Sequence, residues 1–240
     1  MLSVKSVIKG CGHYLPERIV ENKYFENTLD TTDQWIYSRT GIKKRHFASK
    51  NELTSDLAIN AAKKALLDAK IHPETIDVLI LATTTPDQTF PSTATKVQHG
   101  IGMSKGYAFD IQAVCAGFIF ALNNANALIK SGQAKRVLVI GAETFSRILN
   151  WEDRSTCVLF GDGAGAVVLE AEEKKENRRG LLSCTLFSNG KYNDLLYVSG
   201  GVSSTKNSGH VIMQGKEVFK HAVSKLVEAS EKTLKNAKIS

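Results

Sequence analysis

Apolar residues recur at helical spacing along the segment 57–71, which predicts an amphipathic helix. The stripe consists of Leu57, Ala58, Ala61, Ala62, Ala65, Leu66 and Ala69. A continuous apolar run over 78–82 follows, and it is short enough to be a strand buried on both faces. The alternation continues with a strand over 107–111, a helix over 117–130 and a strand over 136–141. This order predicts an α/β architecture in which helices cover a central sheet.

The regular alternation ends near residue 170. The charged run 170–180 has no apolar partner and is interpreted as an exposed hairpin tip or as the seam between two halves. Beyond it, the pattern predicts a strand over 181–187 and an amphipathic helix over 216–238.

The chain also matches itself. Residues 57–71 align with residues 225–239 at an offset of 168 positions, with identities at Ala61/Ala229, Lys64/Lys232, Leu66/Leu234, Ala69/Ala237, Lys70/Lys238 and Ile71/Ile239. An internal duplication would produce this match. Two helices rich in alanine and lysine could also match by composition alone. With a duplication, the second copy would stop at Ser240, and most of the second half would lie beyond it.

The composition is that of an ordinary soluble globule: of 240 residues, 42% are apolar and 23% are charged. The formal net charge is +7. The basic residues are spread along the chain, without the dense stripe and interleaved aromatics of nucleic-acid binders, so we expect no nucleic-acid partner. The charge suits an acidic partner or a phosphorylated ligand.

The cysteines, histidines and apolar runs exclude several classes of protein. Four widely spaced cysteines favour a reducing, cytoplasmic location over a disulfide framework. The six histidines lack metal-ligand spacing, so we expect no metal. Lys5 and Lys9 interrupt what would be the core of a signal peptide. The uncharged run 111–129 contains Gln112 and three asparagines, which favours a buried helix over a membrane span.

Cys115 is the strongest candidate for chemistry. It lies between a predicted strand and the first turn of a predicted helix, beside small residues that leave room for a substrate. The helix dipole and free backbone N–H groups at such a position favour a thiolate and can bind a developing oxyanion. From spacing alone, an inert core thiol remains the alternative. Cys11, Cys157 and Cys184 fall in predicted strands or at their edges and are interpreted as packing residues.

Two further patterns are ambiguous. The glycine-rich run 160–166 leads into a strand-like segment instead of a helix, which favours a tight, closely packed turn over a nucleotide-binding loop. An indole and guanidinium planes can sandwich a purine, which gives Trp35, Arg39 and Arg154 a possible role in combination. Sequence spacing does not show whether these three residues meet.

Five motifs, taken together, resemble the β-ketoacyl-[acyl-carrier-protein] synthase III family. They are DTTDQWIYSRTGIKKRH (30–46), TTTPDQTFPSTA (83–94), DIQAVCAGF (110–118), GAETFSRILNWEDRSTCVLFGDGAGAVVLE (141–170) and MQGKEVFKHAV (213–223). They occur in the family's order and at its spacing, and the resemblance extends over essentially the whole chain.

The resemblance implies a thiolase-like fold, in which two duplicated α/β halves form a five-layered α-β-α-β-α arrangement and work as a homodimer. Residues 1–172 would be the complete first half, and 173–240 the beginning of an incomplete second half. The implied enzyme is an acyltransferase that starts type II fatty acid synthesis. Acetyl-CoA acylates a cysteine, and malonyl-carrier protein is then decarboxylated and condensed to acetoacetyl-carrier protein. No cofactor is implied besides acetyl-CoA as substrate.

The resemblance also assigns roles to single residues. Cys115 matches the acylated thiol, and its own N–H matches half of the oxyanion hole. The residues that match the CoA site are Thr31, Trp35, Arg39, Arg154, Gly215 and Phe219. Phe90 matches a residue offered across the dimer to the primer pocket, which Phe160 lines, and Lys220 matches a carrier-protein docking position. Lys216 stands where family members often have asparagine.

One departure affects the expected activity. The family's catalytic His and Asn, and the loop that supplies the second oxyanion N–H, would belong beyond residue 240. Two alternatives therefore stand beside the main interpretation. One is a truncated gene product that binds CoA or accepts an acyl group at most, and the other is a sister condensing enzyme with a longer or branched primer.

Overall fold

The computed structural model describes residues 4–173 and 179–239. Its strands are β1 (Val4–Tyr14), β2 (Arg18–Glu21), β3 (Lys44–Phe47), β4 (Val78–Ala82), β5 (Tyr107–Ile111), β6 (Arg136–Thr144), β7 (Asp162–Glu173), β8 (Leu196–Val198) and β9 (Val211–Met213). The α-helices are α1 (Lys23–Glu26), α2 (Asp33–Thr40), α3 (Thr54–Ala69), α4 (Thr93–Gly100), α5 (Gly117–Lys130) and α6 (Gly215–Ala237). Short 3-10 helices are η1 (Pro73–Thr75), η2 (Val114–Ala116), η3 (Phe145–Ile148) and η4 (Gly190–Leu195).

The chain folds into two compact units, each built from separate stretches of sequence. Unit 1 contains the described residues of 1–16, 48–144 and 163–184, and unit 2 contains those of 17–47, 145–162 and 185–239. This division groups residues by their contacts. The expected halves, 1–172 and 173–240, concern a duplication and remain a prediction.

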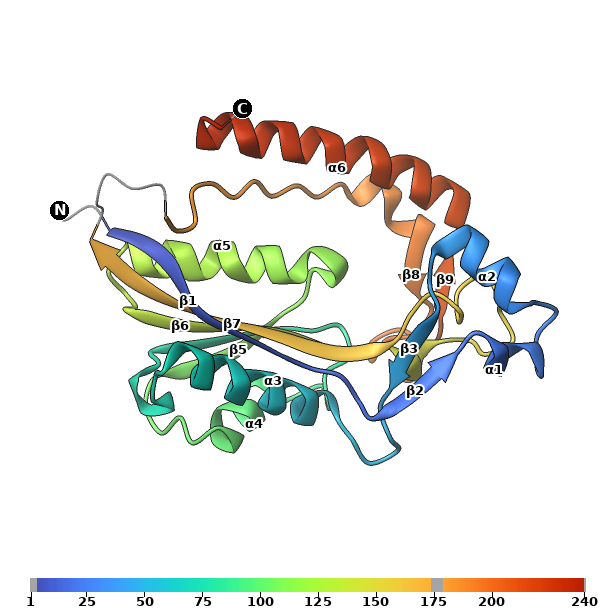
Figure 1. Ribbon diagram of the computed structural model, residues 1–240, viewed down its shortest axis with the longest axis horizontal. Coiled ribbons are helices and arrows are strands. Elements are labelled where there is room, and N and C mark those ends of the chain that lie inside the picture. The colour runs from blue at the N-terminus through green and yellow to red at the C-terminus, as the bar shows by residue number, and fades with distance from the viewer. Residues whose placement is uncertain (1–3, 174–178, 240) are drawn as a thin grey trace. The chain divides into compact units, whose positions relative to one another are not determined.

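Unit 1 is organised around a five-stranded sheet with the order β1-β7-β6-β4-β5 (Figure 1). Strand β4 runs parallel to both β5 and β6, and β1 runs antiparallel to β7. All five residues of β4 are buried, as its continuous apolar sequence predicts for a strand covered on both faces. The predicted strands over 78–82 and 107–111 are confirmed, and the one over 136–141 extends to Thr144.

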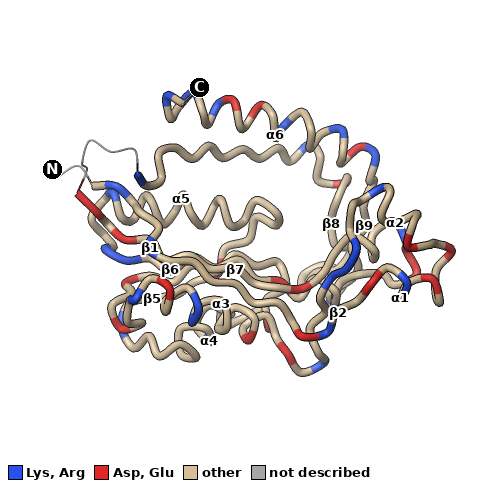
Figure 2. The backbone as a smooth tube through the Cα atoms, viewed as in Figure 1, with Lys and Arg blue, Asp and Glu red and all other residues tan. Residues whose placement is uncertain are grey.

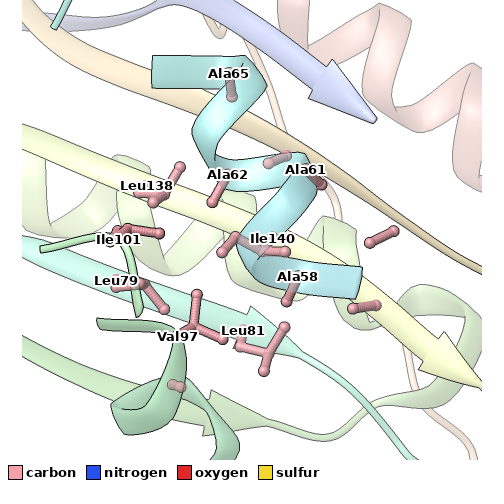
Figure 3. Packing of buried hydrophobic residues seen from close by; sticks show 14 of the residues in the cluster. Ala58, Ala61, Ala62, Ala65, Leu79, Leu81, Val97, Ile101, Leu138 and Ile140 are labelled. Carbon is pink, nitrogen blue, oxygen red and sulfur yellow. The ribbon is translucent and has the colours of Figure 1, made fainter. Parts of the chain in front are cut away.

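Helices cover both faces of this sheet, and alternate residues of its strands face opposite ways. On one face, α3 and α4 pack on Leu79, Leu81, Leu138 and Ile140 (Figure 3). On the other face, α5 packs on the intervening residues Val78, Ile80, Val137 and Val139. The predicted helices over 57–71 and 117–130 are confirmed, although only one face of α5 is buried.

Glycines in β1 let this strand approach α3 closely. A Cβ atom added at Gly12 would lie 2.4 Å from the backbone carbonyl oxygen of Ala61 and from the backbone nitrogen of Ala65. At Gly10, an added Cβ would lie 2.3 Å from the backbone nitrogen of Ala69. The alanine stripe predicted on this helix therefore serves close packing of two backbones as well as burial of apolar surface.

Helices α3 and α6, which the internal alignment pairs, end in the same way. Each ends before a lysine in the left-handed conformation, Lys70 with φ 55° and Lys238 with φ 53°. The following isoleucine then donates its N–H back to a leucine carbonyl at 3.1 Å, Ile71 to Leu66 and Ile239 to Leu234. These positions differ by the same 168 residues, so the helices share a terminal motif as well as composition.

Unit 2 is held together around the buried guanidinium of Arg45. It donates to the carbonyls of Val20 and Val158 and to Oδ1 of Asn22, at 2.8–3.2 Å. Its Cζ lies 4.8 Å from the ring centroid of Phe25. Burial lowers the pKa of Arg45. One side chain thus ties the hairpin formed by β2 and β3 to the segment 145–162.

The predicted strand over 181–187 is wrong. The segment is irregular in the structure, and the backbone bond found near its start is Leu181 N–H to the Ser6 carbonyl, at 2.8 Å. A strand needs a neighbour along its length, and the described residues provide none here. The predicted helix over 216–238 is confirmed as α6, on which none of the described side chains is buried.

The glycine-rich and charged runs also differ from expectation. The glycines do not form a tight turn, because Gly163 and Gly165 lie within β7, where Gly165 pairs with His13. Close packing is found at Gly161, whose added Cβ would lie 3.0 Å from the Arg45 Cβ. The first residues of the charged run continue β7 instead of forming a tip, and 174–178 lie outside the described residues.

Gly12→Ala is expected to destabilise the protein by about 3 kcal/mol or more, because the new methyl group would overlap the α3 backbone. Chemical denaturation measures this change. Gly165→Ala, on the paired strand, is the matched control, since a Cβ there meets nothing within 4 Å. Equal stability of the two variants would contradict the role assigned to the close approach of β1 and α3.

Candidate functional site

Cys115 lies where the sequence places it, in the 3-10 turn η2 between β5 and α5. Its side chain is exposed. Val114, directly before it, has a φ of 48°, which is a strained conformation for a β-branched residue. Helix α5 carries no charged side chain before Lys130 (Figure 2), so no acidic residue of this helix offsets its dipole near the thiol.

Other polar residues gather at the same edge of the sheet, where the parallel strands end. Thr83, Thr84 and Thr85 follow β4, Gln112 follows β5, and Glu143 is the penultimate residue of β6. Ligands of α/β sheets bind at such carboxyl edges. Glu143 and the threonines were not predicted from the sequence, although a carboxylate at the end of an apolar strand is a signal that could have identified them.

The remaining cysteines differ in accessibility. Cys11 lies in β1, as predicted, but its side chain is exposed, so the interpretation of Cys11 as a packing residue is wrong. Cys157 and Cys184 are not in strands, because Cys157 lies in a turn and Cys184 in the irregular segment after β7. Burial, followed by the charge of nearby Asp153, raises the pKa of Cys157 to about 11. Burial also raises the pKa of Cys184.

Trp35, Arg39 and Arg154 do meet in unit 2. The Arg39 guanidinium, one turn along α2, lies 4.4 Å from the ring centroid of Trp35, and that of Arg154 lies 4.9 Å away. Both distances are within cation–π range. Arg154 is also held by the backbone carbonyl of Asp30 and by its carboxylate, at 3.4 Å. Unit 2 therefore presents an aromatic ring flanked by two positive charges.

Thr31 lies just before this helix and has an unusual hydroxyl group. Its Oγ1 is buried and has no hydrogen-bond partner among the described residues. The next residue, Thr32, accepts the Trp35 N–H at 3.0 Å and caps α2. An unpaired buried hydroxyl is costly, and a ligand that hydrogen-bonds to it would remove the penalty.

The first turns of α6 hold three of the expected residues. Phe219 is 72% exposed, and Lys220 is exposed beside it. A Cβ added at Gly215 would meet only the Met213 side chain, at an ordinary 3.6 Å. Packing among the described residues therefore does not require glycine at this position.

The two expected primer-pocket residues lie in different units. Phe90, in the loop between β4 and α4, is 82% exposed. Phe160 is partly buried in the core of unit 2, with its ring 4.5 Å from that of Phe145.

Unit 2 contains a cavity of about 380 Å³, part of whose lining comes from α2, the helix that carries Trp35. It is lined by Glu21, Asn22, Lys23, Asp33, Gln34, Tyr37 and Lys43. Within residues 4–173 and 179–239, no group of His, Cys, Asp and Glu side chains could hold a metal ion. Among those residues, no helix is long and apolar enough to span a membrane.

Comparison with known proteins identifies the family. A family model described as 3-oxoacyl-[acyl-carrier-protein (ACP)] synthase III matches residues 109–204. The chain is 64% identical over 238 residues to the β-ketoacyl-[acyl-carrier-protein] synthase III of Ruegeria pomeroyi, covering 98% of this chain and 73% of that protein. This chain belongs to the β-ketoacyl-[acyl-carrier-protein] synthase III family. The Rhodobacter capsulatus protein of that name is 60% identical, and the match covers 98% of this chain and 74% of that protein.

Solved structures agree with this family assignment. The 3-oxoacyl-[acyl-carrier-protein] synthase III of Aquifex aeolicus superposes with a TM-score of 0.90 at 45% identity, over 98% of this chain and 73% of that one. A priming β-ketosynthase of the R1128 polyketide pathway superposes with a TM-score of 0.91 at 31% identity, over 98% of this chain and 71% of that one. The expected α/β, thiolase-like fold class is confirmed, and the chain is a condensing enzyme of the acyltransferase type.

The unfolding free energy of this synthase-family chain is expected to fall between pH 9 and pH 11, in part because of Cys157. The unfolded thiol ionises near its ordinary pKa of 9.0, whereas the folded thiol stays protonated up to about 11. A raised folded-state pKa stabilises the protein below pH 9, and this contribution is lost as the pH rises through 11. The loss amounts to about 3 kcal/mol.

Denaturation of the wild type and of Cys157→Ala at several pH values measures this effect. Other groups titrate equally in both proteins, so the stability difference between them isolates the thiol. It should shrink above pH 9. Parallel stability curves up to pH 11 would show that burial does not perturb Cys157.

Proposed function

We propose that this chain takes the acetyl group of acetyl-CoA onto Cys115 and transfers it to malonyl-acyl-carrier protein, which starts type II fatty acid synthesis. The observation that carries the proposal is the exposed thiol at the N-terminus of α5. It supports this reaction because the chain is 58–64% identical to relatives named β-ketoacyl-[acyl-carrier-protein] synthase III. Neither a non-catalytic remnant nor a synthase for longer or branched primers is favoured by these relatives.

The proposed chemistry has two steps. In the first, the Cys115 thiolate attacks the thioester carbonyl, the bond from that carbon to the CoA sulfur breaks, and CoA leaves as a thiolate. Backbone N–H groups at the start of α5 would stabilise the tetrahedral oxyanion. In the second, the malonyl group loses carbon dioxide, and its carbanion attacks the acetyl carbon. A carbon–carbon bond forms, and the Cys115 thiolate is released.

The stack around Trp35 is the proposed site for the CoA adenine. An adenine ring that enters between the indole and the Arg154 guanidinium would stack on both. Arg39 adds a second positive charge near the nucleotide phosphates. The unpaired Thr31 hydroxyl supports this site, because a purine nitrogen could accept its hydrogen bond.

Residues on α6 are proposed to bind the rest of CoA and the carrier protein. We assign Gly215 and Phe219 to the CoA chain, because an open glycine and an exposed aromatic ring suit an extended ligand. Lys220 would dock the carrier protein, with the chain's formal charge of +7 favouring an acidic partner. Phe160 remains the proposed lining of a short primer pocket, and Phe90 the residue offered across the dimer to the pocket of a second copy.

The open edge of the sheet supports a homodimer. The edge strand of unit 1 is β5, and the structure shows no strand pairing on its outer side within the described residues. On the β4 side, the Tyr107 N–H donates to the Asp77 carbonyl, and the Ile111 carbonyl accepts the Thr83 N–H. The amide groups of Ala108 and Asp110 therefore face outward. An unpaired edge with one charge among its five residues suits pairing with a second copy.

Ala108→Pro is expected to convert a dimer into a monomer, since proline removes an outward N–H without touching the β4 ladder. Sedimentation velocity measures the change. Ala108→Val keeps the N–H and should remain dimeric. A dimer that survives the proline substitution would place the contact elsewhere.

Incubation with acetyl-CoA is expected to add one acetyl group to Cys115, detected by intact and peptide mass spectrometry. Cys115→Ser should abolish the gain, whereas Cys11→Ser, which removes the other exposed thiol, should leave it unchanged. Arg154→Ala should raise the acetyl-CoA concentration needed for half-maximal acylation about tenfold, because it removes half of the stack.

A control separates loss of the CoA site from loss of the thiol. N-acetylcysteamine thioesters carry no adenine, so Arg154→Ala should leave their reaction with Cys115 unaffected. Acetylation of another residue, or no acetylation in any variant, would overturn the proposed function.

A further inference from the structure

The proposed reaction does not use Glu143, a largely buried carboxylate at the end of β6. Its Oε1 accepts the Thr84 N–H at 2.8 Å, and its Oε2 accepts the hydroxyls of Thr83, at 3.4 Å, and of Thr85. No lysine or arginine of the described residues pairs with it. Burial raises the pKa of Glu143, while these hydrogen bonds oppose the shift.

The carboxylate joins two strand ends that a polar network already connects. The Thr85 hydroxyl also accepts the Thr144 N–H at 2.9 Å. The Thr54 hydroxyl, at the start of α3, donates to the Thr85 carbonyl at 2.7 Å. Burying a carboxylate without a cation is unfavourable, so the three donors are arranged to hold Glu143 in one orientation.

A further bond leads from this network to the thiol. The Gln112 side-chain amide donates to the Thr84 hydroxyl at 3.1 Å. Gln112 lies three residues before Cys115, and Val114 between them is strained at a φ of 48°. A strained turn persists only where its surroundings fix it. The contacts therefore run from Glu143 through Thr84 and Gln112 to the turn that carries the nucleophile.

We propose that Glu143 is a positioning residue, which acts through Thr84 and Gln112 to keep the Cys115 thiol at the N-terminus of α5. The inference deepens the proposed function and rests on Cys115 as the acyl acceptor. It assigns to Glu143 no contact with substrate. An apolar residue would fill the same space without a desolvation penalty, but it would leave the Thr84 N–H and two hydroxyls without an acceptor.

Substitutions of Thr84 test the bridge without removing the carboxylate. Thr84→Val deletes the hydroxyl that Gln112 bonds and keeps the backbone N–H that Glu143 accepts. It should slow acetylation of Cys115 by acetyl-CoA about fivefold to tenfold, the effect of one lost hydrogen bond. Thr84→Ser keeps the hydroxyl and should retain the wild-type rate. Glu143→Leu, where it folds, should slow the reaction at least as much.

Thiol alkylation provides a second readout that needs no CoA site. Iodoacetamide labelling, resolved by peptide mass spectrometry, gives the rates at Cys115 and at exposed Cys11 in the same sample. Thr84→Val should lower the Cys115 rate relative to the Cys11 rate. Thr54→Val is the structural control. It removes the hydroxyl that donates to the Thr85 carbonyl, in the same network but not bonded to Gln112. It should lower the melting temperature without changing this ratio.

The outcomes separate the inference from the proposed function. A slower Cys115 in Thr84→Val, restored in Thr84→Ser and absent in Thr54→Val, supports positioning. Unchanged acetylation and alkylation in Thr84→Val overturn it, as does an equal loss in Thr54→Val. If wild-type Cys115 is never acetylated, the proposed function fails, while the alkylation ratios still decide the role of Glu143.

Discussion

The complete burial of strand β4 is the constraint on which unit 1 depends. Its five apolar residues are covered on both faces and paired on both edges, so the strand has one position in the sheet. A strand with no exposed face cannot slip in register without moving apolar groups off their partners. The residues that follow it, Thr83 to Thr85, are thereby fixed beside the ends of β5 and β6. The candidate chemistry lies at that carboxyl edge.

At the carboxyl edge of the sheet, where the apolar core ends, hydrogen bonds between polar groups hold the chain. Parallel strands that finish at one edge leave backbone donors and acceptors unpaired there, and buried groups of this kind need partners. Here Glu143 and the threonines supply them, and Asp110 at the end of β5 accepts the first N–H groups of α4. Burial raises the pKa of Asp110. The same edge thus combines desolvated carboxylates with an exposed thiol, Cys115.

Unit 2 uses positive charge in two different ways. Arg45 is buried, makes hydrogen bonds to carbonyl and amide oxygens, and serves packing. Arg39 and Arg154 are exposed beside an indole and have spare donors for a ligand. Burial separates the two roles, because a desolvated guanidinium needs partners within the protein, and among the described residues all donor atoms of Arg45 except the buried Nε have one. The sequence shows the same residue type in each case, and its spacing does not distinguish them.

The sequence by itself determined the strongly periodic elements, from the alanine stripe of α3 to the apolar run of β4, and it placed Cys115 before a helix. These signals are local, because periodicity and turn chemistry act over a few neighbouring residues. The tertiary structure alone decided that 181–187 is not a strand, that the glycines of β7 lie in the sheet, and that Arg154 reaches Trp35. Glu143 became meaningful only with the threonines around it. Each of these depends on which distant segments become neighbours, and hydrogen bonds between such segments leave no periodic trace in the sequence.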